Sequence, residues 1–573
     1  MAANGFPAWA REFSEKYYSG AFVMFVLHGN VHDVVPRPRP QGTDLLSLRR
    51  FLEQELFAQR DLVMTYDRGS GLDFATADAQ KDFQQALDGY DAFHGTNFKA
   101  GLPRNPDGVL NILDNYLRLR LHDNRKIALV LDFAETLAPA GDVGHMNAED
   151  RNTLVILKRW AHHPTFLRSD ITIVLITENL VELNQGILQH PGVAAIPIAL
   201  PDEAERRTVL EDQIRQTPLP EGSLSDIPAL ANLTAGLKRL QLQTMVRYAA
   251  RNRQPLTMKE LSDRKKQFIE AESGGMLEFV QPKWNLSMVA GAAAAKQKLL
   301  DAAQAIRTGR TDVLPMGYLI CGPVGTGKTF LATCFAGDVG IPAVTLKNFR
   351  SQWQGVTEGN LERVLGLLRA MSPIVVIVDE ADAQLGDRSN SGDSGVSNRV
   401  FAQIAQFMGN TDNRGRVIWF LLTCRPDLLP VDLKRQGRAE EHLALFYPET
   451  IEDRVAMLRA MQKKTGAAFA SATEAEALFA RQPGNFSGAD IEALLTRAKM
   501  RATLAGRASI ETADLEQTLG DFIPASSPGE VELQTLVAVL ECTSRSLLPE
   551  GYRIRDRSEL TQRAAALAAL VEK

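Results

Sequence analysis

The feature that most constrains this chain is the segment GPVGTGKT at residues 322–329. It follows an apolar run of strand length, Gly317 to Cys321, and precedes a helical run, Phe330 to Ala336. In such a loop, backbone N–H groups converge on phosphate oxygens, while the lysine and threonine reach the phosphates and Mg²⁺. The helix N-terminus adds partial positive charge. A plain glycine turn is the competing interpretation. The full motif in this context predicts a phosphate site made by Gly322, Pro323, Val324, Gly325, Thr326, Gly327, Lys328, Thr329 and Phe330.

Two acidic residues end a second apolar run, IVVIVDEAD at residues 374–382. Open parallel sheets bind ligands at the carboxyl ends of their strands, so these acids are expected beside the glycine-rich loop. We expect Asp379 to hold Mg²⁺ together with Thr329, and Glu380 to act as general base on the attacking water. Either acid alone could be a solvated strand end. The pair, 50 residues beyond the lysine–threonine step, predicts a site for Mg²⁺ and the phosphates of a nucleotide.

Short apolar runs alternate with amphipathic helical stretches, and the alternation occurs twice. Runs without polar alternation are typical of parallel strands covered by helices on both faces. The sequence therefore predicts an α/β fold of two P-loop-type parallel-sheet modules, each followed by a helical lid. The expected strands lie at 21–27, 60–66, 126–132, 171–177 and 193–199, and again at 317–321, 342–346, 374–379, 417–423 and 442–446.

Length and composition narrow the class of protein. The 573 residues are enough for about four domains. A net charge of −5 gives no general basic field, so nucleic acid is not indicated as a partner. Four cysteines without metal-ligand spacing favour a reducing compartment. No apolar run approaches the ~18 residues of a membrane span, and a secretory signal is not expected. The expected location is the cytoplasm, with no membrane partner.

The two motifs resemble those of the AAA+ ATPases, specifically the AAA clade, and the resemblance covers about residues 281–520. Five further stretches carry it: MVAG at 288–291 with Lys296, WQG at 353–355, NRVFAQIAQFMG at 398–409, LTCRPDLLPVDLKRQGR at 422–438 and FSGAD at 486–490. The resemblance implies that Val289 and Ala290 contact the adenine. It also implies that Gly488 and Ala489 contact the nucleotide from the start of a lid helix.

Two arginines close the 422–438 stretch. The resemblance implies that Arg435 and Arg438 act in trans, on the γ-phosphate held by the next subunit. A planar, permanently charged guanidinium suits that task better than a lysine. Two solvated surface arginines are the competing interpretation. A head-to-tail contact closes only by rotation, so such fingers imply a ring, and the family predicts a homo-hexamer.

Trp353, Gln354 and Gly355 lie where the family has its aromatic pore loop, which implies that they grip a protein substrate. A core tryptophan is the alternative. The segment 386–397, low in apolar residues, lies where the family has a second pore loop, and a plain surface loop is equally compatible with it.

One residue departs from the family pattern. Cys424 stands where the family has a sensor asparagine. An amide hydrogen-bonds water and phosphate well, whereas a thiol is a weak donor and acceptor. The sequence therefore predicts either slow turnover or sensing by another residue.

The first half lacks the chemistry of the second. FVMFVLHGNVHD at 22–33 has no glycine-rich loop and no lysine–threonine step, and Phe133 follows Asp132 where a general base would stand. This half is interpreted as a degenerate AAA+ module, a tandem layout that resembles cyanobacterial and plastid AAA proteins. The expected domains are 1–220, a degenerate AAA-like domain; 221–280, lid and linker; 281–449, the active core; 450–525, its lid; and 526–573, a helical tail.

Three functions remain open from the sequence. The leading one is an ATP-hydrolysing ring that remodels or threads protein substrates. The others are a slow ATPase acting as a nucleotide-switched scaffold, and a nucleic-acid motor or loader. No basic stripe with interleaved aromatics accompanies the pore-loop region, which argues against the motor.

Overall fold

A computed structural model describes residues 6–39, 42–347, 357–385, 394–481, 486–523 and 527–571. Trp353, Gln354 and Gly355 lie outside the described residues, as do residues 386–393 of the segment expected to be a second pore loop. The chain divides into two compact units. One is Met1–Ile269 with Glu358–Ala370, and the other is Glu270–Thr357 with Met371–Lys573.

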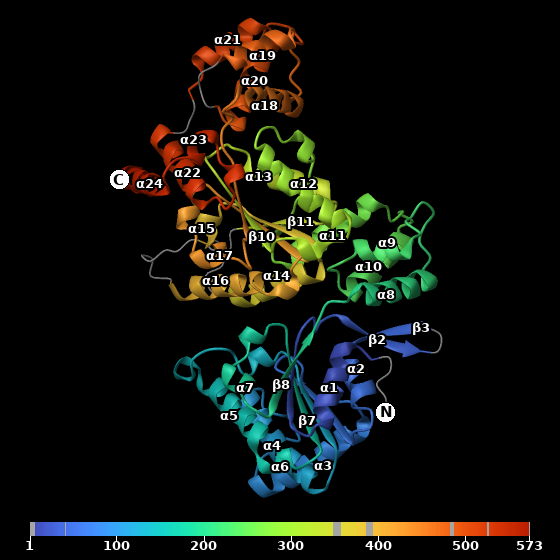
Figure 1. Ribbon diagram of the computed structural model, residues 1–573. Helices are drawn as coiled ribbons and strands as arrows, with labels where there is room; N and C mark the ends of the chain where they lie inside the picture. Colours follow the sequence, from blue (N-terminus) through green and yellow to red (C-terminus); the bar gives the residue numbers. More distant parts are fainter. Residues whose placement is uncertain are drawn as a thin grey trace. The chain divides into compact units, whose positions relative to one another are not determined.

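The first unit is built on a six-stranded sheet with the order β5-β4-β6-β7-β1-β8. Two of its strands, β7 and β8, are labelled among the surrounding helices in Figure 1. Five of its strands are parallel, and β5 pairs antiparallel with β4 at one edge. The strands are β1 (Met24–Gly29), β4 (Leu62–Asp67), β5 (Gly71–Phe74), β6 (Ile127–Leu131), β7 (Ile171–Thr177) and β8 (Val193–Ile198). A separate hairpin pairs β2 (Val34–Arg39) with β3 (Gly42–Ser47).

The second unit repeats this sheet. Its order is β14-β10-β13-β12-β11-β9, again with five parallel strands and one antiparallel edge strand, β9. Its strands are β9 (Leu277–Phe279), β10 (Gly317–Cys321), β11 (Ala343–Leu346), β12 (Ile374–Val378), β13 (Val417–Thr423) and β14 (Glu441–Ala444). In both sheets the first parallel strand lies between the fourth and the fifth. The predicted α/β fold and its duplicated architecture are confirmed, while the antiparallel edge strands β5 and β9 and the hairpin were not expected.

Helices cover both faces of the first sheet, which explains why its strands are apolar without alternation. On β1, Met24 and Val26 pack into a core with α3, α4 and α5, whereas Phe25 and Leu27 pack into a second core with α1 and α2. The helices of this part of the chain are α1 (Ala8–Tyr18), α2 (Leu48–Phe51), α3 (Ala77–His94), α4 (Pro106–His122), α5 (Ala148–His162), α6 (Pro164–Leu167) and α7 (Gln185–Leu188).

Each sheet is followed by four consecutive lid helices. The first set is α8 (Glu203–Gln216), α9 (Ile227–Leu233), α10 (Arg239–Arg251) and α11 (Met258–Glu272); the second is α18 (Ile451–Thr465), α19 (Ala472–Ala480), α20 (Gly488–Leu504) and α21 (Thr512–Asp521). Capping boxes begin α8, at Asp202 and Glu205, and α20, at Ser487 and Asp490. The second set encloses its own apolar core.

The remaining helices are α12 (Ala293–Arg307), α13 (Lys328–Val339), α14 (Thr357–Ala370), α15 (Ala381–Leu385), α16 (Ser394–Met408), α17 (Val431–Lys434), α22 (Pro528–Glu541), α23 (Glu550–Arg553) and α24 (Arg557–Val571). Helices α22 and α24 share an apolar cluster, and Ala538 of α22 also enters the core beside β10. Within the described ranges, none of the helices has the length and apolarity that crossing a bilayer requires.

Glu541, the last residue of α22, ties this helix to the segment before Arg435. Its carboxylate lies 2.8 Å from Lys434 Nζ and 3.2 Å from His442 Nδ1. Burial alone would lower the pKa of His442, but its bonds to Glu541 outweigh burial and raise it. Burial would raise the pKa of Glu541, but His442 and Lys434 lower it. His442 and Glu541 therefore favour their charged forms together.

This cluster should give the stability of the second unit a pH dependence. The raised His442 pKa contributes stability fully below its ordinary value of 6.5 and loses it above. The lowered Glu541 pKa contributes fully above its ordinary value of 4.5 and loses it below. Glu541→Gln should therefore cost most between these values, about 1–3 kcal/mol, and less at pH 8. The melting temperatures of the wild type and of Glu541→Gln, each at pH 5.5 and pH 8, measure this loss of stability. An equal loss at both pH values would contradict the assignment.

Candidate functional site

The loop after β10 is held by close backbone contacts that only glycine permits. Gly322 has φ +144°, and a Cβ there would lie 2.1 Å from the carbonyl oxygen of Leu445. Gly325 has φ +78°, and a Cβ there would lie 2.6 Å from Ser487 Oγ, at the start of α20. Side chains at these positions would push the loop off β14's continuation and off the lid. Glycine at these two positions therefore allows the loop to lie against both Leu445, after β14, and Ser487, at the start of α20.

Lys328 begins α13 and bends back over the loop. Its side chain is buried, and Nζ lies 2.9 Å from the carbonyl oxygens of both Gly322 and Pro323. Nζ is also 3.1 Å from Cys424 Sγ, at the end of β13. The Lys328 ammonium group thus lies inside the loop, where it can bind phosphate oxygens instead of the backbone carbonyl oxygens.

The predicted magnesium pair is brought together. Thr329 Oγ1 donates to Asp379 Oδ2 at 2.8 Å, although the two residues are 50 positions apart. The other carboxylate oxygen of Asp379 accepts from the backbone N–H of Glu380 at 2.9 Å. A hydroxyl and a carboxylate are hard oxygen ligands that suit Mg²⁺. Thr329 and Asp379 therefore fit a Mg²⁺ site at the carboxyl edge of the sheet.

Glu380 follows in a left-handed conformation, with φ 48°. Non-glycine residues rarely adopt it, and such residues are concentrated at functional sites. Gln384 donates to the carbonyl oxygen of Asp379 at 2.7 Å, and Thr423 Oγ1 donates to Asp382 Oδ1 at 2.7 Å. These bonds fix the strand ends of β12 and β13 around the two acids.

The lid approaches the loop from the other side. A Cβ at Gly488 would lie 3.8 Å from Gly325 O, and a Cβ at Gly325 would lie 3.7 Å from Ala489 Cβ. Lys464 Nζ of α18 lies 5.4 Å from the ring centroid of Phe330. The structure thus brings Gly488, Ala489 and Phe330 to the seam between lid and loop.

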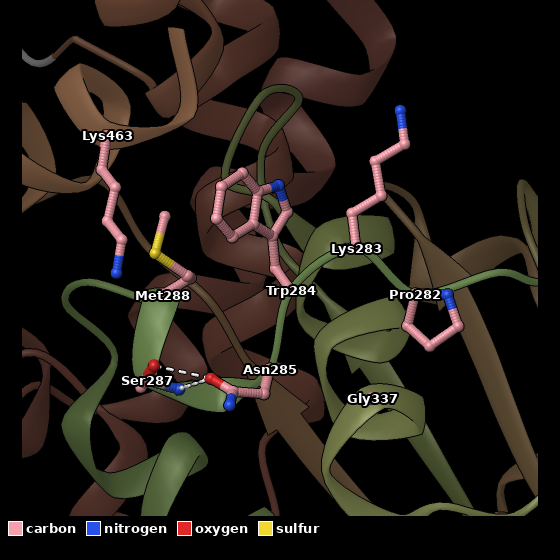
Figure 2. Close-up of a pocket in the computed structure, with 8 residues that line it drawn as sticks. All are labelled: Pro282, Lys283, Trp284, Asn285, Ser287, Met288, Gly337 and Lys463. Carbon is pink, nitrogen blue, oxygen red and sulfur yellow. Dashed lines mark hydrogen bonds between the residues drawn. The ribbon is translucent and has the colours of Figure 1, made fainter. Parts of the chain in front are cut away.

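Val289 and Ala290 lie in the short segment between Met288 and α12. Lys296 Nζ donates to the carbonyl oxygen of Val289 at 2.9 Å, which fixes the segment against α12. A neighbouring pocket of about 330 Å³ is lined by Pro282, Lys283, Trp284, Asn285, Ser287, Met288, Gly337 and Lys463 (Figure 2). No P-loop residue 322–329 is among its lining residues, so this hollow is distinct from the phosphate loop.

Arg435 and Arg438 differ in exposure. The side chain of Arg435 is 60% exposed, and that of Arg438 is 12% exposed. Arg438 Nη1 donates to Asp432 O at 2.6 Å, and burial lowers its pKa. Among the described residues, the side chains of both arginines pair with Asp432. Arg435 is the more accessible of the two.

Two residues at this site were missed from the sequence. Gln534 Oε1 of α22 accepts from the N–H of Val324 at 2.9 Å, and Tyr447 Oη donates to the carbonyl oxygen of Val324 at 2.8 Å. Burial, with Asp490 and Cys424 nearby, raises the pKa of Tyr447 to about 12. The available signal was weak: Gln534 is a polar residue on the apolar face of a helix, between Leu533 and Leu536.

The first unit repeats the frame of this site with different residues. Asp132 Oδ1 accepts from the N–H of Phe133 at 2.9 Å, and Phe133 is left-handed with φ 50°. Asp379 and Glu380 have the same bond and nearly the same φ. Burial raises the pKa of Asp132. A phenyl ring thus occupies the place that the Glu380 carboxylate has in the second unit.

Known protein families match separate stretches of the chain. The family described as AAA+ chaperone, N-terminal Rossmann-like domain, matches residues 1–199, and AAA+ chaperone, second helical domain, matches 204–274. The family described as ATPase family associated with various cellular activities (AAA) matches residues 318–447. The last match includes the P-loop, the acidic strand end and both arginines.

Curated relatives include two kinds of AAA protein. A Cell division cycle protein 48 homolog of Archaeoglobus fulgidus is 28% identical over 58% of this chain and 49% of its own length. An ATP-dependent zinc metalloprotease, FtsH 3 of Sphaerobacter thermophilus, is 31% identical over 43% of this chain and 51% of its own length. The chain therefore spans about half the length of these relatives.

The geometry and the matches agree on one assignment. An AAA domain is an ATP-hydrolysing module that takes ATP with Mg²⁺, and the residues for both are assembled here. The chain thus contains an AAA ATPase domain, preceded by two AAA+ chaperone-type domains.

Proposed function

We propose that the chain is an ATP-driven ring that remodels or threads protein substrates, with nucleotide chemistry confined to the second module. The observation that carries the proposal is the contrast between two sheets of the same strand order. The second sheet's edge bears Lys328, Thr329, Asp379 and Glu380, and the first bears Asp132 and Phe133 at the corresponding strand end. The proposal therefore predicts that each chain binds one nucleotide.

The roles of the individual residues complete the mechanism. Lys328 and the loop N–H groups hold the phosphates, Thr329 and Asp379 hold Mg²⁺, and Glu380 removes a proton from the attacking water. Val289, Ala290, Gly488 and Ala489 surround the base and sugar. Mg²⁺ supplies charge neutralisation on the β- and γ-oxygens when bound.

The proposal also includes the assembly of several chains and the substrate on which they act. Arg435 and Arg438 act on the nucleotide of a neighbouring subunit, which makes a homo-hexamer the expected assembly. Trp353, Gln354 and Gly355 grip an extended protein segment in the ring. Support comes from the relatives, one of which is an ATP-dependent zinc metalloprotease. The cytoplasmic location and the domain boundaries stay predictions.

A substrate trap tests protein remodelling. Glu380→Gln chains should bind ATP, assemble and retain protein substrates that co-purify. Adding Trp353→Ala to the trap should remove the captured proteins while leaving ATP binding and melting temperature unchanged. Capture that survives Trp353→Ala, or a large loss of stability on making it, would overturn the pore-loop assignment. Capture of nucleic acid alone would favour the motor.

A second candidate, a slow ATPase that switches a scaffold, is favoured by Cys424. Its thiol lies 3.1 Å from Lys328 Nζ, where a stronger hydrogen-bonding group would orient water. Cys424→Asn should raise kcat about tenfold, equivalent to about 1.4 kcal/mol, with KM for ATP little changed. Cys424→Ala is the matched control and should give no gain. Equal kcat values for wild type and Cys424→Asn would remove this support for the scaffold.

A further inference from the structure

The loop after β1 in the first unit lies where the P-loop lies in the second. Each loop follows the strand that pairs with the fourth and fifth parallel strands of its sheet. Gly29 and Gly322 both have positive φ, and a Cβ at either would press on a backbone carbonyl oxygen, of Ile198 at 2.8 Å or of Leu445 at 2.1 Å. Asn30 to Asp33 therefore occupy the position of the phosphate loop.

The third lid helix faces this loop in both units. In the second unit, the start of α20 lies against Gly325 through Ser487. In the first unit, the start of α10 binds Asp33. The N–H groups of Arg239 and Leu240 donate to its two carboxylate oxygens at 2.9 Å each, and Arg239 Nη1 lies 3.3 Å from Oδ2.

The Asp33 carboxylate occupies a buried anion-binding site. Asp33 is 3% exposed and Arg239 is 5% exposed. Two N–H groups at a helix N-terminus beside a guanidinium form the arrangement that binds phosphates and carboxylates. Asn30 Nδ2 also donates to Asp33 Oδ2 at 3.0 Å, and Arg239 Nη2 lies 2.8 Å from Glu205 on α8. In the part of the chain that is described, Asn30 Oδ1 and Arg239 Nε are buried without a hydrogen-bond partner.

An ordinary helix cap does not explain this arrangement. A cap comes from the residue before the helix, and here that residue is Lys238, whose ammonium group cannot accept a hydrogen bond. The acceptor comes instead from a residue 206 positions away, in the loop that corresponds to the P-loop.

We propose that Asp33 is a built-in anion that takes the place of a nucleotide phosphate in the first module. It links the loop after β1 to α10 and, through Arg239, to α8, so the lid α8–α11 stays closed on its sheet without nucleotide. A free phosphate cannot bind here, because the Asp33 carboxylate already occupies the positively charged site at the start of α10. The proposal rests on the absence of ATP chemistry in the first module.

Hydrogen exchange of the full chain, read by peptide mass spectrometry, tests the proposal. Asp33→Ala should raise exchange at the start of α10 and in α8 at least tenfold, while β1 and β7 stay protected. Added acetate or inorganic phosphate should restore protection in Asp33→Ala and change nothing in the wild type. Asn147→Ala, which removes the local cap of α5, is the matched control and should affect α5 alone.

Each other outcome is decisive. Unchanged exchange of α8–α11 in Asp33→Ala, or no restoration by either anion, would overturn the proposal. If Asp33→Ala fails to fold, Asp33→Asn decides: it keeps the size but loses the charge, and wild-type protection of α10 in it would sink the idea. ATP should protect the start of α20 and leave α10 unchanged. Protection of α10 by ATP would refute the built-in anion, whereas no protection of α20 would instead refute the proposed function.

Discussion

Glu380→Gln is expected to abolish ATP turnover while ATP binding persists. The amide keeps the size and the left-handed backbone position but cannot take a proton from water, so kcat should fall by about 10²–10⁴-fold. Lys328→Ala should act differently, because its ammonium lies inside the loop and its loss should weaken binding itself. Steady-state ATPase rates and equilibrium binding of a fluorescent ATP analogue separate the two effects.

The control for Glu380→Gln is Glu476→Gln, which removes a carboxylate that pairs with Arg459 on the lid surface and should leave both quantities unchanged. Residual turnover within a few-fold of wild type in Glu380→Gln would assign the base elsewhere. Retained ATP binding in Lys328→Ala would indicate a second nucleotide site and contradict a single active module.

Mixing two inactive variants should restore activity. Arg435→Ala removes a largely exposed guanidinium, and an arginine finger contributes about 10³–10⁵-fold to turnover. Lys328→Ala disables the opposite side of a shared site. In a mixed ring, a subunit with an intact P-loop receives Arg435 from its Lys328→Ala neighbour, so part of the activity should return.

ATPase titration of one variant into the other, with assembly followed by light scattering, gives the measurement. Arg438→Ala is a weaker test, because that side chain is mostly buried and bonded to Asp432, so its loss also disturbs the loop. Co-assembly without any recovered turnover would argue that Arg435 acts within its own chain, or not at all.

The sequence predicted the strands that carry chemistry because those strands are fully buried and apolar. Ile374–Val378 and Val417–Thr423 are buried at every position, and their polar residues begin only where the strand ends. The edge strands β5 and β9 were missed because they are short, with mixed polarity and partial exposure. Strands of four and three residues are too short to show the alternation that identifies a half-buried strand.

The candidate site was predictable where its residues share one motif and not where distant segments meet. Lys328 and Thr329 are adjacent in a single motif, so their proximity follows from the sequence. Gln534 reaches Val324 across 210 positions, and Asp33 reaches Arg239 across 206. Those contacts depend on how a tail or a lid packs, and single polar residues in helices or loops give no periodicity from which to infer it.

The bond between Gln534 and Val324 has a thermodynamic consequence for whatever engages the tail. The P-loop shares a hydrogen bond with α22, and α22 packs against α24. A partner that shifts α22 and changes ATP affinity by some factor must find its own affinity changed by that same factor when ATP binds. ATP occupancy and tail occupancy would then be two readouts of one coupling free energy.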